Sequence, residues 1–288
     1  MGPDDDAIFQ DADTGDIIGV VLRGFIADKE IVEWIGDILE QAVNMRRNCR
    51  RDDGGSLVQV GYTTGSQHRP VFDWAKNITA TKSQLAKMDF ADLEFQTGSV
   101  FALIWNMFRH CLPQSIMANW YKVLEDIGVC RMDGGLKGDG DRSEYTIMYG
   151  GLPYSFFTGE LAPPMGMIGK HYSRHIHKEG SPVDHLLSYQ CRRSLGKDGG
   201  GSFFYASHGI QVIQTANMVI THRPKILHGT ALQLRGPNGE HDESDTLGLS
   251  FLLAPKLPKV WKAYQEGKMG HEAAEAEMEK EDHDKFET

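Results

Sequence analysis

A cluster of histidine and carboxylate residues in the second half of the chain could bind a metal ion. His177 and Glu179 stand two positions apart, and His228 follows about fifty residues later. On a β-strand alternate side chains share a face, so His177 and Glu179 would offer one nitrogen and one oxygen ligand to the same ion. His228 ends an apolar strand candidate at 225–228 and could add a second imidazole. Two histidines and one carboxylate leave one face of a metal open, which suits non-haem Fe(II) chemistry.

Neighbouring residues offer alternatives to this ligand set. His171 and His175 share strand parity with His177, so they could line the same site or orient a ligand. Asp184 is an alternative carboxylate if Glu179 points away. Two further histidines are expected to be structural or surface residues: His185 and His222.

The order of the short motifs around these residues resembles a known family. After the H-x-E pair come a glycine turn with aromatic residues at 199–204, an LHGT motif that contains His228, and an apolar strand at 247–253. This order resembles the double-stranded β-helix of the Fe(II)/2-oxoglutarate oxygenases, with a rhythm similar to the TET/JBP-type and prolyl-hydroxylase-type branches. The resemblance covers roughly the last half of the chain and implies a metal centre of His177, Glu179 and His228.

The resemblance also implies the cofactors Fe(II), 2-oxoglutarate and, as an accessory reductant, ascorbate. The family places an Arg or Lys on the strand after the second histidine, where it pairs with the far carboxylate of 2-oxoglutarate, but the strand at 246–251 carries no cation. A guanidinium fork suits a carboxylate, and three arginines could replace the missing cation: Arg235, Arg192 and Arg193. Tyrosines that begin the β region could bind the cosubstrate or fill the core: Tyr145, Tyr149 and Tyr154.

The helical and strand patterns follow one another along the chain. Apolar residues three and four apart predict helices after the capping residue Asp28 and at 82–93, 99–111 and 114–127, with breaks at Gly98 and Pro113. Strands are predicted at 16–23 and 57–62, and then in number from 143 onward. This order predicts an α+β protein whose double-stranded β-helix core, jelly-roll or cupin-like, is buttressed by N-terminal helices.

The expected organisation is a single oxygenase-like domain at 16–265, with its helical part at about 28–127 and its β core at about 128–256. Residues 1–15 are expected to be a disordered N-terminus, and 266–288 a charged C-terminal tail. The 288 residues, 40% hydrophobic, suffice for a sizeable core.

Charge and cysteine content restrict the function further. The formal net charge of −10 disfavours nonspecific attraction to nucleic-acid phosphates, although the run RRNCRR at 46–51 is locally basic. The four cysteines are widely spaced and contain no C-x-x-C pair, which supports neither a zinc knuckle nor a disulfide framework. No leader-like or membrane-spanning apolar run is visible, so we expect a cytoplasmic or nuclear protein with no membrane partner.

Together these features predict a non-haem Fe(II)-dependent, 2-oxoglutarate-dependent oxygenase that hydroxylates or oxidises a C–H bond. The acidic charge favours a small-molecule or amino-acid-like substrate over nucleic acid. The alternatives are a TET/JBP-like nucleobase dioxygenase, which would need cationic groove contacts and stacking aromatics for a flipped base, and a catalytically degenerate jelly-roll binding protein. A metal hydrolase on a cupin-like barrel would use similar ligands, and would act with Zn(II) and without O2.

Overall fold

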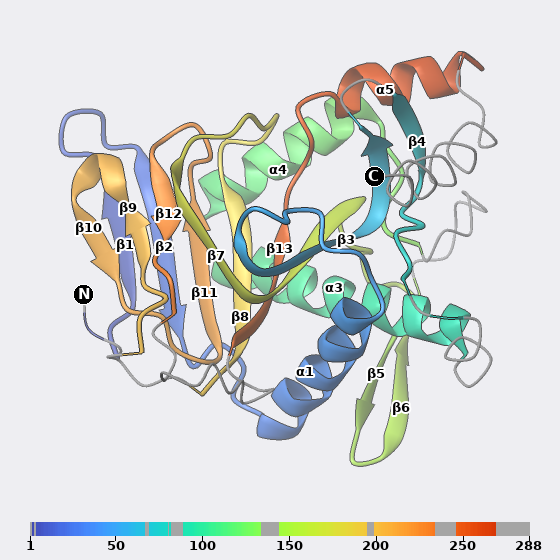
Figure 1. Ribbon diagram of the computed structural model, residues 1–288, viewed down its shortest axis with the longest axis horizontal. Coiled ribbons are helices and arrows are strands. Elements are labelled where there is room, and N and C mark those ends of the chain that lie inside the picture. The colour runs from blue at the N-terminus through green and yellow to red at the C-terminus, as the bar shows by residue number, and fades with distance from the viewer. Residues whose placement is uncertain are drawn as a thin grey trace, which may run out of the picture.

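The computed structural model describes residues 2, 4–66, 69–79, 81, 89–133, 144–194, 199–233 and 246–268 (Figure 1). Arg235 and the predicted charged tail from 269 onward lie outside the described residues. The elements are, in order, β1 (Ala7–Gln10), β2 (Ile17–Arg23), α1 (Lys29–Asn44), β3 (Gly54–Gly65), β4 (Pro70–Trp74), α3 (Phe90–Cys111), α4 (Gln114–Ile127), β5 (Tyr145–Tyr149), β6 (Leu152–Phe156), β7 (Met165–His177), β8 (Leu186–Arg193), β9 (Phe203–Tyr205), the short 3-10 helix η1 (Ala206–His208), β10 (Ile210–Val212), β11 (Met218–His222), β12 (His228–Thr230), β13 (Thr246–Phe251) and α5 (Leu257–Gln265).

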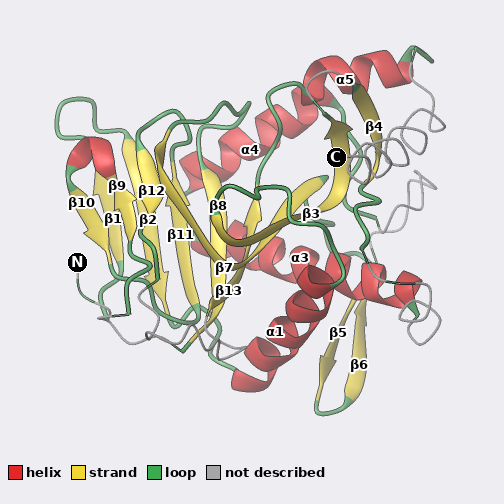
Figure 2. Cartoon of the chain, viewed as in Figure 1, coloured by secondary structure: helices red, strands yellow, loops and turns green. Residues whose placement is uncertain are grey.

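A large curled antiparallel sheet dominates the molecule (Figure 2). Within the described residues it has eleven strands, with β1, β2, β11, β8, β13, β7, β12, β9 and β10 hydrogen-bonded in that order, and with β3 joined to β7 and β4 to β3. The β5–β6 hairpin forms a separate two-stranded sheet. This architecture confirms the predicted α+β fold class with its curled β core.

Helices cover one face of the sheet and form the predicted buttress. α1 begins at Asp28, whose side chain accepts hydrogen bonds from the backbone N–H groups of Glu30 and Ile31, and its buried face contacts β7, β8 and β13. α3 packs on β13 through ring contacts of Phe101 and Trp105 with Phe251. Among the described helices, none is long and apolar enough to cross a membrane.

α3 runs without a break through Gly98, where the sequence predicts a boundary between two helices. Gly98 is buried, and a Cβ built on it would find its nearest neighbour, the backbone oxygen of Met132, at 4.0 Å. Tertiary packing therefore overrides the low helix propensity of glycine, which costs about 1 kcal/mol relative to alanine.

Strands from the first third of the chain enter the sheet beside the late strands. β2 pairs with β11, and β3, which is longer than the predicted strand at 57–62, pairs with β7 along most of its length. β1 lies inside the segment that we expected to be disordered, where it pairs with β2 while the Phe9 ring contacts Tyr205 with centroids 5.5 Å apart. The early part of the chain thus supplies strands to the core as well as helices.

Candidate metal centre

A pocket of about 480 Å³ lies against the face of the sheet opposite to α3. Strand register builds its floor: Ser250 of β13 lies opposite Ser188 of β8 on one side and Met167 of β7 on the other, and Met167 lies opposite Gln59 of β3. These four side chains all line the pocket, whereas the neighbouring Phe251 points to α3. The alternation along each strand therefore separates the pocket from the helix-packed core.

Two β-bulges in β7 change which of its side chains face the pocket. Against β3, Gly54 and Ser56 lie opposite Ser173 and Lys170, so one extra residue of β7 is accommodated there. Against β12, Thr230 lies opposite Arg174, and His228 lies opposite His177, which again leaves one extra residue. Each bulge inverts the alternation, and the residues of β7 that line the pocket are accordingly Met165, Met167, Gly169, Tyr172, Arg174 and His177.

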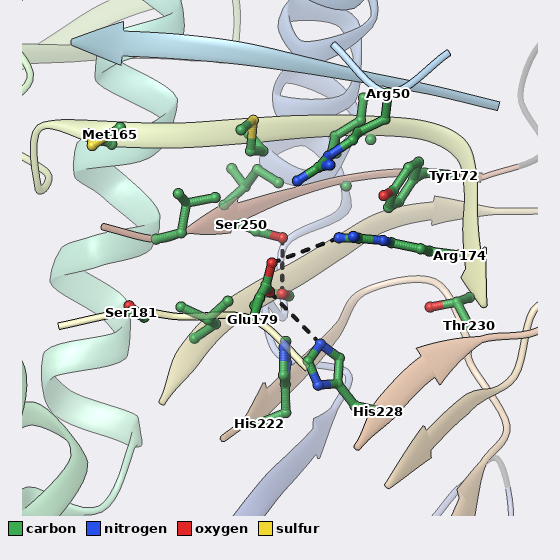
Figure 3. Close-up of a pocket in the computed structure, with 18 of the residues that line it drawn as sticks. Arg50, Met165, Tyr172, Arg174, Glu179, Ser181, His222, His228, Thr230 and Ser250 are labelled. Atoms are coloured by element: carbon green, nitrogen blue, oxygen red, sulfur yellow. Dashed lines mark hydrogen bonds and ion pairs between the residues drawn. The ribbon is translucent and has the colours of Figure 1, made fainter. Parts of the chain in front are cut away.

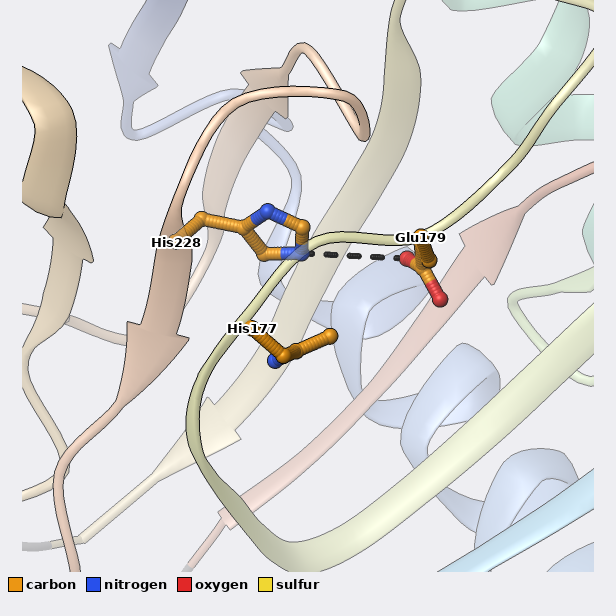
Figure 4. A group of neighbouring side chains, drawn as sticks. All are labelled: His177, Glu179 and His228. Atoms are coloured by element: carbon orange, nitrogen blue, oxygen red, sulfur yellow. Dashed lines mark ion pairs between the residues drawn. The ribbon is translucent and has the colours of Figure 1, made fainter.

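The structure brings His177, Glu179 and His228 together at one end of this pocket (Figure 4). Each offers one ligand atom, and the three atoms lie within 4.8 Å of one another. His228 and His177 come from the paired strands β12 and β7, with ring centroids 4.4 Å apart. Glu179 lies just beyond β7, where its backbone N–H donates to the Pro224 oxygen at 2.9 Å, and its Oε1 is 3.7 Å from Nε2 of His228.

Backbone carbonyl groups determine which nitrogen of each histidine is free. Nδ1 of His177 lies 2.8 Å from the His175 oxygen, and Nδ1 of His228 lies 2.8 Å from the Ile226 oxygen. A carbonyl oxygen can only accept, so each Nδ1 carries the proton and each Nε2 keeps its lone pair. Ligating histidines are oriented in this way in metal sites, and the two free Nε2 atoms with the Glu179 carboxylate make a suitable donor set for a divalent metal.

Burial and mutual contact set the protonation of this group. Burial is the main cause that lowers the pKa of His177, which favours the neutral imidazole that a metal requires. Burial acts to raise the pKa of Glu179, but the approach of His228 and the charges of the neighbouring histidines outweigh it, so this pKa is lowered. The carboxylate is therefore ionised at neutral pH, as a ligand must be.

Positively charged side chains line the pocket next to the three ligands (Figure 3). Arg174 bridges two carboxylates, with Nε 3.5 Å from Oδ2 of Asp53 and Nη1 3.8 Å from Oε2 of Glu179. Tyr172 donates its hydroxyl hydrogen to the same Asp53 oxygen at 2.6 Å. Arg50 reaches into the pocket from the loop before β3. Arg174 and Arg50 together place two guanidinium groups in the lining of the pocket, which suits it to an anion once a metal is bound.

Two of the three arginines expected from the sequence, Arg192 and Arg193, do not line the pocket. Arg192 forms ion pairs with Asp37 and with Glu40 of α1, the latter at 2.8 Å. A β-bulge causes this, because Leu247 and Gly248 of β13 lie opposite Arg192 and Gln190, and the extra residue turns Arg192 to the helix side while Gln190 lines the pocket. Arg193 donates to the Gly200 oxygen at 2.6 Å.

Other residues predicted for the site lie outside the pocket. Tyr149 is 41% exposed on the β5–β6 hairpin, and Asp184 is an exposed residue that accepts from Asn119 at 2.9 Å. His175 is exposed, and His171 has a positive φ of 55° at the first bulge of β7. Tyr145 is buried against Phe156, and Tyr154 is exposed. None of these side chains lines the pocket among the described residues.

Sequence reasoning missed several pocket residues: Arg50, Tyr172, Arg174 and His222. Strict alternation from His177 assigns Tyr172 and Arg174 to the opposite face, and only the bulges bring them round. The glycine pair at 54–55 opposite β7 is the one sequence signal of irregular pairing. His222 ends β11, is 8% exposed and lies beside His228, and burial with a smaller effect of His228 lowers its pKa to about 3.

Comparisons with known proteins found similarity in structure alone. No protein-family model and no curated protein matches the chain. NgTET1 in complex with 5mC DNA aligns over 84% of this chain and 74% of its own, at 12% identity with a TM-score of 0.50. A viral collagen prolyl hydroxylase, vCPH from Paramecium Bursaria Chlorella virus-1 in complex with 2OG, aligns over 81% and 93%, at 8% identity with a TM-score of 0.32. AviO1 from Streptomyces viridochromogenes Tue57 aligns over 49% and 86%, at 13% identity with a TM-score of 0.23.

The similarity to NgTET1 extends over most of both chains, and the antiparallel pairing of β7 with β12 and of β8 with β13 brings together the strands that the motif order predicts. The chain therefore has the double-stranded β-helix fold of the Fe(II)/2-oxoglutarate oxygenases.

Proposed function

We propose that the protein is an Fe(II)- and 2-oxoglutarate-dependent oxygenase that acts on a C–H bond of a small-molecule or amino-acid-like substrate. The observation that carries this proposal is the donor set of His177, Glu179 and His228, with both histidine tautomers set by backbone carbonyl groups and both Nε2 atoms free. Two imidazoles and one carboxylate hold Fe(II) and leave positions open. When bound, Fe(II) with 2-oxoglutarate and O2 supplies the oxidising chemistry.

Residues of the pocket would bind and orient 2-oxoglutarate, the organic acid that serves as cosubstrate. Arg174 lies 3.8 Å from the ligand Glu179, and Arg50 faces the same space, so these two guanidinium groups are the candidates for pairing with its carboxylates. We assign them this role in place of Arg192, whereas Arg235 lies outside the described residues. Ser188 and Ser250, whose hydroxyl oxygens are hydrogen-bonded to each other at 2.9 Å, would offer hydroxyl groups to the acid from the floor of the pocket.

A small substrate fits the size and lining of the pocket. Its volume of about 480 Å³ falls in the range of small-molecule sites, and its lining also includes apolar side chains such as Met165 and Leu252.

The test is an anaerobic titration of the metal-free protein with Fe(II), followed by 2-oxoglutarate, in a visible absorption spectrometer. We expect one equivalent of iron to bind, and a charge-transfer band to grow when the keto acid chelates it. His228→Ala should lose both signals, whereas His208→Ala, a substitution of a histidine outside the pocket, should keep them.

Other outcomes would favour the alternatives. Iron binding without the band would argue against 2-oxoglutarate as the cosubstrate. A protein that binds no iron fits the degenerate jelly-roll binding protein, and turnover with Zn(II) in the absence of O2 fits a metal hydrolase. Oxidation of a methylated base in duplex DNA would favour the TET/JBP-like alternative.

A further inference from the structure

His222 is a buried histidine in the same pocket that the three ligands do not include. It is the last residue of β11, where it lies opposite Leu186 of β8, and its side chain lines the pocket next to His228 and Glu179 (Figure 3). Its ring centroid is 4.3 Å from that of His228 and 5.1 Å from that of Phe203. Only 8% of the residue is exposed.

Neither ring nitrogen of His222 has a hydrogen-bond partner in the described part of the chain. Three neighbouring histidines differ: His177 and His228 each bond a backbone oxygen through Nδ1, and His185 bonds the Ile17 oxygen through Nε2 at 2.8 Å. A buried imidazole without an acidic hydrogen-bond partner is neutral, so it has one N–H to donate and one lone pair to offer. A buried polar group without a hydrogen-bond partner destabilises the fold, so such a group beside a pocket calls for a partner.

The position of His222 indicates what this partner is. Among the described residues the set of ligand atoms that lie within 4.8 Å of one another contains His177, Glu179 and His228 and leaves His222 out. Its ring packs against that of His228 in the lining of the pocket, and both of its nitrogens are buried with no hydrogen-bond partner among the described residues. His222 therefore lines the pocket beside a ligand without being one, which suits it to contact a molecule bound on the metal.

We propose that His222 hydrogen-bonds an oxygen atom of the organic acid that the metal holds, and so positions that acid in the pocket. This inference rests on the proposed function. His222 would act opposite to the arginines, because Arg174 and Arg50 approach from β7 and the loop before β3, whereas His222 approaches from β11. A carboxylate or keto oxygen accepts the N–H, and the site gains directional hydrogen bonding that guanidinium groups on one side alone do not supply.

The test compares three variants in the Fe(II)-loaded protein with 2-oxoglutarate as the probe. His222→Phe keeps the ring and removes both nitrogens, His222→Gln keeps a donor and an acceptor, and His185→Gln changes a buried histidine outside the pocket. We expect His222→Phe to weaken 2-oxoglutarate binding about tenfold or more, His222→Gln to restore part of it, and His185→Gln to bind as the natural protein does. Iron affinity should stay within about threefold in all three, because the ligands are intact.

Thermal unfolding of the metal-free variants separates this role from a structural one. His222→Phe should unfold at the same temperature or higher, since an apolar ring replaces two unsatisfied polar atoms. If His222→Phe binds 2-oxoglutarate as tightly as the natural protein, the inference is overturned and the proposed function stands. Loss of affinity with an equal loss of thermal stability in His222→Phe and His222→Gln also overturns it. A natural protein that binds iron but no 2-oxoglutarate overturns both proposals.

Discussion

Two backbone oxygens, those of His175 and Ile226, orient the histidine ligands of the metal centre. Each holds the Nδ1–H of one ligand histidine at 2.8 Å and so directs the opposite nitrogen toward Glu179. The position of these oxygens depends on local backbone geometry two residues before each histidine. A site whose tautomers are set before metal binding loses less entropy when the ion arrives.

Alanine substitutions of Glu179 and of Asp184 can identify the carboxylate ligand of the metal. Glu179→Ala should weaken Fe(II) binding by more than about 100-fold, because loss of a direct ligand costs more than loss of an orienting group. Asp184→Ala should bind iron normally, since Asp184 is exposed and pairs with Asn119. Isothermal titration under anaerobic conditions measures both, and normal iron binding by the Glu179 variant would remove this residue from the ligand set.

The anchor of the organic acid can be found among the arginines. Arg174→Gln should weaken 2-oxoglutarate binding by about 10- to 100-fold, the range of one lost charge-assisted hydrogen bond or pair. Arg192→Gln should have little effect on binding, because Asp37 and Glu40 hold that side chain against α1. If the charge-transfer titration shows weakened 2-oxoglutarate binding in Arg192→Gln and normal binding in Arg174→Gln, Arg192 is the anchor, as the sequence predicts.

At the scale of elements, β7 determines the composition of the site. The H-x-E spacing and the LHGT motif allow His177, Glu179 and His228 to be predicted from the sequence, because such spacings are local. Arg174 could not be assigned, because two β-bulges that depend on pairing with β3 and β12 decide its face. The same physical cause turns Arg192 away: its strand bulges where it pairs with β13.

The first bulge of β7 depends on a glycine of β3. Gly55 has a φ of 77°, and a Cβ there would lie well inside van der Waals contact of the His171 carbonyl oxygen. Gly55→Ala should lower the free energy of unfolding by more than about 2 kcal/mol, from left-handed strain together with the clash. It should also weaken 2-oxoglutarate binding, since the displaced bulge carries Tyr172 and Arg174.

Gly24→Ala is the matched control for the bulge. Gly24 also has a positive φ of 56°, but a Cβ there meets nothing within 4 Å, so its cost should be limited to about 1–2 kcal/mol of backbone strain. Chemical denaturation of the two variants gives the comparison. Equal destabilisation, with unchanged binding of the organic acid by both, would contradict the dependence of the bulge on Gly55.

The buried His185, which directly precedes β8 and bonds the first residue of β2, should make the stability of the fold depend on pH. His185 bonds the Ile17 oxygen, and burial is the main cause that lowers its pKa, while Arg223 lowers it and Asp184 and Asp16 act against the change. A histidine with a lowered pKa in the folded state binds its proton more readily when unfolded. Its stabilising effect is complete above the unfolded value of about 6.5 and is lost as the pH falls below it.

Thermal unfolding of the metal-free protein between pH 8 and pH 5 measures this dependence. The melting temperature should be level above about pH 7 and fall below about 6.5. His185→Gln should reduce the slope of that fall, because one of the groups that bind a proton on unfolding is absent. An unchanged slope in this variant would show that His185 does not contribute.

At the scale of the whole molecule, the motif order predicts the fold class, but not how distant segments join. The sequence places helices early and strands late, yet β2 pairs with the late strand β11 and β3 with the late strand β7, through contacts that join residues far apart in the chain. Local periodicity carries no information on such pairing. The loop before β3, which brings Arg50 to the pocket, belongs to this non-local part.

Two arginines of the basic run at 46–51 lie in different parts of the molecule, one in the core and one at the pocket. Arg46 is 5% exposed and forms a buried ion pair with Glu94, while Arg50 lines the pocket. A phosphate-binding surface needs several cations facing the same exposed strip, and these two arginines face different parts of the molecule. The formal net charge of the whole chain is −10, so the long-range field also opposes a polyanion.

We therefore expect weak binding to duplex DNA. A fluorescently labelled duplex with methylated cytosine, titrated at 150 mM salt, should bind no more tightly than the usual nonspecific range of about 10⁻⁴ to 10⁻⁶ M, with equal affinity for the unmethylated duplex. The similarity of fold to NgTET1, at 12% identity, does not carry the DNA contacts with it, since function depends on the groups that line a site. Binding much tighter than this range, selective for the methylated duplex and coupled to iron-dependent oxidation of the base, would replace the small-molecule proposal with the nucleobase alternative. Weak, unselective binding in a protein that forms the charge-transfer band directs the search to small acids and amino acids, because those substrates fit a pocket of about 480 Å³.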